Sequence, residues 1–369
     1  MTALRVVDLF AGAGGLSLGF EQAGSEVDGI EVVLAVESNA KAVRTYQANH
    51  PGTVVLHETI SKDWDVVERL KEHLEDPTCD VLIGGPPCQG WSTLGGRGNK
   101  ERRMGLNACV DYFVAQVRSL RPAAVVMENV RGLAVKDGGK HLKRVLRQIR
   151  RMGYWVRSYD VRAADFGVPQ LRHRVFVVGL LKELGIRYEL HKSHGPEEWL
   201  TVWDAIGDLP SLAAGSSATE YAAAPRNDFQ RRMREGSETL TWQEAPDHSP
   251  EIREVLRALR GEGASRADIE DKVTLTSGFH NTYCRLRSDM PAPAVTSSAG
   301  RVSSGRNAHP RDDRALTPRE AARLQSFPDR YRWEAERWPV YEQVGNAVPP
   351  ALAEAVAVPL LRRLGPVLG

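Results

Sequence analysis

Short apolar runs alternate with longer segments of helical periodicity along most of this chain. The runs are rich in β-branched residues, as is typical of buried strands, and lie at residues 4–9, 32–36, 79–83, 125–127 and 175–179. Helical spacing of apolar residues follows at 110–120 and 142–152. This alternation predicts an α/β fold with a doubly wound, mostly parallel sheet.

The alternation fades between about residue 182 and about residue 276, where Gly-Ser, Ala-rich and charged runs are mixed. We therefore predict a first domain at 1–181, a separate lobe at 182–276, and a return to the first domain at 277–369. The helical segment 250–260 of the lobe has little apolar face, which predicts thin packing or a partner surface. Two further helices are predicted at 316–327 and, near the C-terminus, at 349–364.

Composition limits the classes of fold and function that are possible for this chain. The 369 residues are 42% hydrophobic, enough for a sizeable core, and a net charge of +2 is too small to diagnose nucleic-acid binding. The four cysteines, at 79, 88, 109 and 284, lack the spacing of metal ligands or of a disulfide scaffold, so we expect no metal site and a reducing compartment. The N-terminus shows no signal peptide, and no apolar stretch is long enough to cross a bilayer. We therefore expect a cytoplasmic protein without a membrane partner.

Two glycine-containing turns follow predicted strands, and the first suits a nucleoside ligand. Residues 10–15 read Phe-Ala-Gly-Ala-Gly-Gly and precede a helix, whose free N–H groups lie beside the turn. Glu37 ends the next strand, where a carboxylate can accept hydrogen bonds from ribose hydroxyls. The spacing is not the phosphate-binding G-x-G-x-x-G, which favours a cofactor with adenosine but no pyrophosphate. A purely structural turn is the alternative.

The second turn carries a thiol. Residues 84–92 read Gly-Gly-Pro-Pro-Cys-Gln-Gly-Trp-Ser, and the two prolines fix the backbone ahead of Cys88. A thiolate needs a polar, accessible position, which a loop leaving the carboxyl end of a parallel strand supplies. Cys88 is therefore a candidate nucleophile, and a small apolar filler is the alternative.

Further sequence motifs follow one another in a characteristic order along the chain. Asp-Leu-Phe at 8–10 is followed by Gly-Pro-Pro-Cys-Gln at 85–89, Met-Glu-Asn-Val at 127–130, Gln-Leu-Arg-His-Arg at 170–174, Arg-Glu-Ala-Ala-Arg-Leu-Gln-Ser-Phe-Pro at 319–328 and Gly-Asn-Ala-Val-Pro-Pro at 345–350. Nearly the whole chain thus resembles the DNA (cytosine-5)-methyltransferase family. The resemblance implies a Rossmann-like methyltransferase sheet with a small target-recognition domain, and an S-adenosylmethionine-dependent DNA methyltransferase activity.

The resemblance also implies catalytic roles. Cys88 would add to carbon 6 of a cytosine so that carbon 5 can take the methyl group, with Glu128 at ring nitrogen 3. A carboxyl group that donates there must be protonated, so we expect Glu128 in a partly desolvated pocket. Arg172 would contact the ring oxygen, and Arg174 would brace the site. Two alternatives stay open: Glu128 is a strand-end carboxylate paired to Arg172 or Arg174, and Arg174 belongs to a solvated strand face.

For the cofactor, S-adenosylmethionine, the resemblance implies a wall built from several separate segments of the chain. Its residues would be Phe10, Gly12, Gly14, Glu37, Ile60, Pro86 and Asn346. The chain departs from the family at Thr59, where an aspartate is usual, and at Cys109, where a leucine is usual. Glu58 or the Thr59 hydroxyl is the candidate replacement for the missing acidic contact.

Duplex DNA is the implied substrate, and its cytosine must be flipped out of the helix to be reached. Residues 90–105 resemble a mobile loop that closes over the base. The implied DNA-binding residues are Gln89, Ser92, Arg97, Lys100 and Arg102. The cation-rich helix around 140–151 is either a phosphate contact or a solvated face. In the lobe, groove contacts are available from Arg226, Arg231, Arg232, Arg234 and Trp242.

Two other functions remain open at this point. A tRNA cytosine-5 methyltransferase would carry the same catalytic motifs, and a noncatalytic DNA-binding module derived from the enzyme would keep the fold. We expect a monomer, with a cognate restriction endonuclease as a candidate partner.

Overall fold

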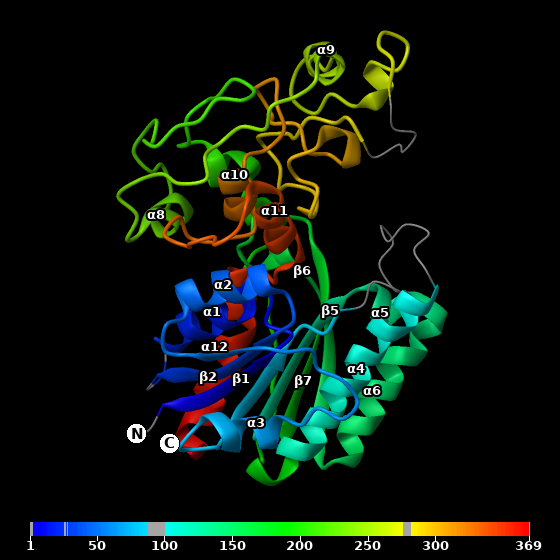
Figure 1. Cartoon of the computed structure of the whole chain (residues 1–369), viewed down its shortest axis with the longest axis vertical. Helices are drawn as coiled ribbons and strands as arrows, with labels where there is room; N and C mark the ends of the chain where they lie inside the picture. Colours follow the sequence, from blue (N-terminus) through cyan, green and yellow to red (C-terminus); the bar gives the residue numbers. More distant parts are fainter. Residues whose placement is uncertain (1–2, 26, 28, 88–99, 276–281, 369) are drawn as a thin grey trace. The chain divides into compact units, whose positions relative to one another are not determined.

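The computed structural model describes residues 3–25, 27, 29–87, 100–275 and 282–368, with backbone alone at 100–107 (Figure 1). The chain forms two compact units. Unit 1 comprises 1–162, 173–192 and 350–369, and unit 2 comprises 163–172 and 193–349. The lobe predicted at 182–276 is thus too short: unit 2 continues to Pro349, and it also takes in a ten-residue excursion at 163–172. Sequence patterning missed this because residues 277–349 contain few periodic runs.

Unit 1 is built on one seven-stranded sheet with the order β3-β2-β1-β4-β5-β7-β6. The strands are β1 Leu4–Leu9, β2 Ile30–Glu37, β3 Val54–His57, β4 Val81–Gly84, β5 Ala124–Val130, β6 Tyr154–Arg162 and β7 His173–Leu181. The first five are parallel, whereas β7 runs antiparallel to both β5 and β6. The predicted doubly wound, mostly parallel α/β sheet is therefore confirmed.

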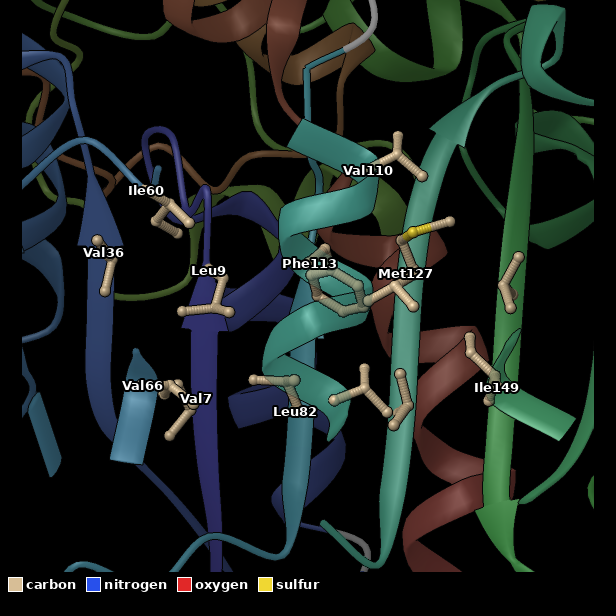
Figure 2. Close-up of a cluster of buried hydrophobic side chains, with 14 of the residues drawn as sticks. Val7, Leu9, Val36, Ile60, Val66, Leu82, Val110, Phe113, Met127 and Ile149 are labelled. Carbon is tan, nitrogen blue, oxygen red and sulfur yellow. The ribbon is translucent and has the colours of Figure 1, made fainter. Parts of the chain in front are cut away.

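Helices cover both faces of this sheet (Figure 1). Those of unit 1 are α1 Gly15–Gly24, α2 Ala40–Asn49, α3 Val66–His73, α4 Lys100–Leu120, α5 Gly132–Val135, α6 Lys140–Arg151 and α12 Pro350–Leu368. Side chains on α3, α4 and α6 pack on the face formed by Val7, Leu9 and Leu82. Phe113 of α4 is fully buried there and lies in front of β4 and β5 in Figure 2. Burial of one such ring contributes about 1.5–3 kcal/mol.

The C-terminal helix α12 packs against α1, the first helix of the chain. The approach is so close that a Cβ at Gly19 would lie 2.4 Å from the Ala353 Cβ, so only glycine fits. One helical stretch of the described residues, Arg337–Leu368, is long and apolar enough to cross a membrane, with 61% of its apolar window buried. The expectation that no stretch has this length was therefore wrong; burial in the fold accounts for its apolar composition.

Unit 2 has short helices and long connections. Its α-helices are α7 Val202–Ile206, α8 Asp228–Arg234, α9 Pro250–Ala258, α10 Pro318–Leu324 and α11 Arg337–Asn346. The 3₁₀ helices of the two units are η1 Lys136–Gly139, η2 Ala163–Phe166, η3 Lys182–Leu184, η4 Pro196–Glu198, η5 Arg266–Asp268 and η6 Val302–Ser304. Contrary to the thin packing expected of α9, Val255, Leu256 and Leu259 are buried in one apolar cluster with Tyr283.

Buried ion pairs add to the apolar contacts within unit 2. The Arg323 guanidinium pairs with Asp208 at 2.6 Å and with Asp329 at 2.6 Å, all three fully buried. Arg314 pairs with Glu320 at 2.8 Å. Burial alone would raise the pKa of Glu320, but the Arg314 charge outweighs it and lowers that pKa to about 2. Removing one member of such a pair leaves an uncompensated buried charge, which typically costs about 3–5 kcal/mol.

Candidate active site

The sheet order places the two predicted turns side by side. Sequential strand order reverses between β1 and β4, and open α/β sheets bind ligands outside the carboxyl ends of the strands at such a point. Leu9, the last residue of β1, is paired with Gly84, the last residue of β4. A Cβ at Gly84 would lie 2.4 Å from the Leu9 carbonyl oxygen, so the tight approach of the two strand ends requires glycine.

The first turn is tied to Glu37 at the end of β2. The Gly12 N–H donates to Glu37 Oε2 at 2.9 Å, and the Asn39 N–H donates to Oε1 at 2.7 Å. Phe10 and Gly12 have φ values of 60° and 57°, an unusual conformation for a phenylalanine. A Cβ built at Gly12 meets no atom within 4 Å. The turn thus presents open space beside an oriented carboxylate and a half-buried ring, an arrangement that fits an adenosine-containing cofactor.

A buried acid lies under this turn. Asp8 of β1 is fully buried and accepts a 2.6 Å hydrogen bond from the Ser17 hydroxyl, which in turn accepts one from Tyr46 at 2.7 Å. Burial raises the pKa of Asp8 to about 7, with smaller contributions from the charges of Glu37 and Glu21, although the Ser17 hydrogen bond opposes the shift. The sequence analysis did not identify Asp8 as a buried acid, although a single acidic residue within the apolar run Val-Val-Asp-Leu indicates one.

The second turn is described only as far as Pro87. Pro86 is buried, and its carbonyl accepts a 3.1 Å hydrogen bond from Asn129 Nδ2, which ties the turn to the end of β5. Cys88, Gln89, Ser92 and Arg97 lie outside the described residues. The Asn129 contact nevertheless fixes the backbone two residues before Cys88.

Glu128 faces this turn and is paired with Arg174. Arg174 Nε lies 2.7 Å from Glu128 Oε1, and the side chains are 15% and 11% exposed. The register explains the pairing: Glu128 lies opposite Phe176, so Arg174, two residues earlier on β7, projects from the same face. A Cβ at Gly85 would lie 3.5 Å from Glu128 Oε2. The carboxyl group is largely buried, as expected, and of the two pairings that the sequence left open the structure shows the one with Arg174.

Arg172 has a different setting, within unit 2. Its guanidinium is buried and donates to the carbonyl oxygens of Val295 at 2.9 Å, Gly345 at 2.8 Å and Ala347 at 3.2 Å. These bonds join the excursion at 163–172 to the segment at the end of α11. Of the two arginines, Arg174 therefore makes the carboxylate contact in this structure.

The remaining predicted cofactor residues differ in their surroundings. Ile60 is 4% exposed and belongs to the core on the α4 face, as Figure 2 shows. Asn346 is exposed at the last position of α11. Glu58, a candidate replacement for the missing aspartate, accepts from Trp64 Nε1 at 2.6 Å and from Arg69 Nε at 2.9 Å. Burial raises the pKa of the Cys109 thiol, as suits a packing residue.

Several of the predicted DNA contacts serve the protein's own structure. Arg231 pairs with Asp228, and Arg234 stacks on Tyr221 at 3.7 Å while donating to the Ala223 carbonyl at 2.7 Å. The predicted loop at 90–105 is too long, because α4 already begins at Lys100. Lys100 and Arg102 therefore lie in the first turn of a helix.

Comparison with known proteins agrees with this architecture. Residues 4–362 match the model of the C-5 cytosine-specific DNA methylase family. The chain belongs to this family. Among its relatives, the Type II methyltransferase M1.HphI of Haemophilus parahaemolyticus is 37% identical over 360 residues, covering 98% of this chain and 87% of that protein. The Type II methyltransferase M.XorII of Xanthomonas oryzae pv. oryzae is 35% identical, with 99% and 86% covered.

Solved structures of methyltransferases show the same fold. A candidate DNA modification methyltransferase encoded within a prophage (E. coli) superimposes with a TM-score of 0.77 at 25% identity, covering 98% of this chain and 99% of that one. The Entamoeba histolytica methyltransferase EhMeth superimposes with a TM-score of 0.64 at 14% identity and 99% coverage of both chains, a likeness of fold alone. This C-5 cytosine-specific DNA methylase is thus a methyltransferase whose relatives serve DNA methylation and restriction-modification.

Proposed function

We propose that the enzyme transfers a methyl group from S-adenosylmethionine to carbon 5 of a cytosine flipped out of duplex DNA, through a transient bond to Cys88. The observation that carries the proposal is the buried Glu128–Arg174 pair, set against the turn that leads to Cys88 and beside the open glycine turn. A carboxyl group and a guanidinium beside the turn that leads to Cys88 match the needs of a pyrimidine ring.

The chemistry assigns each of these groups a step. The Cys88 thiolate forms a bond to carbon 6, and the ring electrons move to carbon 5, which is otherwise too weak a nucleophile. S-adenosylmethionine would supply an electrophilic methyl carbon, and its sulfur would keep the electrons of the broken sulfur–methyl bond and leave as S-adenosylhomocysteine. After carbon 5 has taken the methyl group, a base removes the proton from carbon 5, the bond from sulfur to carbon 6 breaks, and the thiolate is restored. No net oxidation or reduction occurs.

Glu128 and Arg174 stabilise the charge that develops on the ring. Arg174 holds the Glu128 carboxyl in place for ring nitrogen 3, and its own guanidinium is positioned to meet the ring oxygen. Arg172 is then a positioning residue, since its three bonds to carbonyl groups stabilise the backbone at 295 and 345–347. The geometry thus favours an exchange of the roles that the resemblance gave to the two arginines.

The chain's own residues also fit the cofactor. Glu37, which accepts hydrogen bonds from the Gly12 and Asn39 N–H groups, would also accept from ribose hydroxyls, and Phe10 would contact a purine ring. Gly14, Ile60, Pro86 and Asn346 complete the proposed wall. The exposed Thr59 hydroxyl is the better replacement for the missing acidic contact, because Glu58 is engaged by Trp64 and Arg69.

We further propose that the enzyme acts as a monomer in the cytoplasm, alongside a cognate restriction endonuclease. The names of the two relatives bear only on the restriction partner, since both are Type II methyltransferases. The DNA contacts that we propose are Gln89, Ser92, Arg97, Lys100 and Arg102, of which the first three lie outside the described residues.

The proposal is tested by sequencing bisulfite-treated DNA from a host that expresses the chain. We expect 5-methylcytosine at one short sequence in the host expressing the wild-type chain and none in a host expressing Cys88→Ala. The purified protein should form a covalent adduct with a duplex that carries 5-fluorocytosine at that target, because fluorine does not leave as a proton does. Methylation that persists in Cys88→Ala, or the absence of any adduct at a confirmed target, would refute the mechanism.

A further inference from the structure

Helix α6 carries an unusual concentration of positive charge. Its twelve residues include six lysines and arginines and no acid. The whole chain has a net charge of +2, so the remainder of the protein carries a net charge of −4. The positive charge of this protein is thus concentrated on α6, whereas the remainder of the chain is net negative.

These cations form a stripe along one face of α6. Lys140, Arg144, Arg147 and Arg151 follow one another at spacings of four, three and four residues, and all four are exposed. We call them the cationic stripe. The opposite face, with Val145 and Ile149, is buried in the core. The stripe is about 16 Å long, the axial rise of roughly five phosphates on one DNA strand.

Helix stability does not explain the stripe. Like charges at positions i and i+4 repel one another, and the stripe contains two such pairs, Lys140 with Arg144 and Arg147 with Arg151. A cation at the first position, as at Lys140, also opposes the helix dipole, whereas only Arg151 in the last turn is favoured by it. The isolated helix would therefore be more stable with fewer of these charges.

The protein's own acids do not neutralise the stripe either. Arg144 pairs with Asp111 at 2.9 Å. Within the described part of the chain, the side chains of Lys140, Arg147 and Arg151 make no ion pair or hydrogen bond. Three cations on one exposed line thus have no partner among the residues that the structure describes.

We propose that the cationic stripe binds the phosphate backbone of duplex DNA without reading its sequence. The inference rests on the proposed function for the identity of the polyanion. Phosphate contacts raise affinity and make it salt-dependent, but they carry no base information. The stripe would therefore hold the enzyme on DNA and leave its chemistry and its target unchanged.

The test compares two variants of the full chain with equal changes of charge. The stripe variant is Lys140→Gln/Arg147→Gln/Arg151→Gln. The control variant removes three exposed cations elsewhere on unit 1 and is Lys62→Gln/Lys71→Gln/Arg363→Gln. Binding of a labelled duplex is measured by fluorescence anisotropy over a range of salt concentrations, and methyl transfer is measured separately at saturating DNA.

For the stripe variant we expect affinity to fall roughly tenfold at low salt, and the slope of log K against log salt to become shallower by about 2–3. We expect kcat, the methylated sequence and cofactor binding to stay unchanged, and thermal stability to stay equal or rise. An equal loss in the control variant, an unchanged slope, or a fall in kcat at saturating DNA would overturn the inference. A wild-type protein that binds duplex but methylates none would refute the proposed function, while the anisotropy comparison would still decide on the stripe.

Discussion

The buried carboxyl group of Asp8 makes stability depend on pH in a direction opposite to that of most carboxylates. Its pKa rises from 3.8 to about 7 in the folded protein, chiefly through burial. Between these values the folded state holds a proton that the unfolded state has released. The stabilisation is therefore fully present below about pH 4 and is lost as pH rises through about 7.

The size of the effect follows from the shift. About three pKa units correspond to about 4 kcal/mol in total, of which about 3 kcal/mol is lost between pH 5 and pH 8. Asp8→Asn removes the titration and keeps an oxygen that can accept from Ser17. The difference in unfolding free energy between the variant and wild type should therefore shift by about 3 kcal/mol in favour of the variant between pH 5 and pH 8.

Hydrogen exchange of peptides from β1, measured in the full chain at both pH values, reports this local unfolding free energy. Ser17→Ala is the matched control, because the Ser17 hydrogen bond lowers the pKa of Asp8 and its loss should move the transition to higher pH. A difference between Asp8→Asn and wild type that is the same at pH 5 and pH 8 would show that Asp8 is not a buried, protonated acid.

Three further predictions concern the site itself. Arg174→Met should lower kcat/KM by at least about 100-fold, because the substitution leaves the Glu128 carboxylate buried without its cation. A radiolabelled methyl-transfer assay measures this loss, and near-normal activity would contradict the pairing. Arg172→Met should instead destabilise unit 2 by about 2–4 kcal/mol in urea unfolding, and an unchanged midpoint would contradict its bracing role. Glu37→Gln should weaken cofactor binding about tenfold in calorimetry, while Asp247→Asn, far along the chain in unit 2, should leave it unchanged.

The sheet was predictable because five of its strands are apolar runs between helical patterns. Residues 4–9 match β1 at both ends, and the run at 32–36 lies within β2, which begins two residues earlier and ends one residue later. Two strands were missed for identifiable reasons. β3 has four residues, half-buried at its start, and β6 alternates charged and apolar positions at the sheet edge. Neither gives the continuous apolar signal of a central strand.

The contacts within the candidate site could not be predicted from the sequence. Arg172 and Arg174 are equivalent in sequence, yet Arg174 lies on β7 opposite β5, whereas Arg172 belongs to the excursion at 163–172. Only the antiparallel register of β7 decides which of them reaches Glu128. Periodicity gave little information in unit 2, where the helices are short and arginine–carboxylate pairs such as Arg323 with Asp208 are buried beside the apolar residues. A pattern of hydrophobic positions does not reveal such buried ion pairs.

The packing of α12 on α1 has a consequence for the order of events during synthesis. The face of α1 around Gly19 is completed only when residues from Pro350 onward are available. At about 5–20 residues per second, a ribosome needs roughly 20–60 s to reach them after α1 has been made. Throughout that interval the nascent sheet lacks one of its covering helices. Unit 1 therefore completes its packing last, although its first strand is translated first.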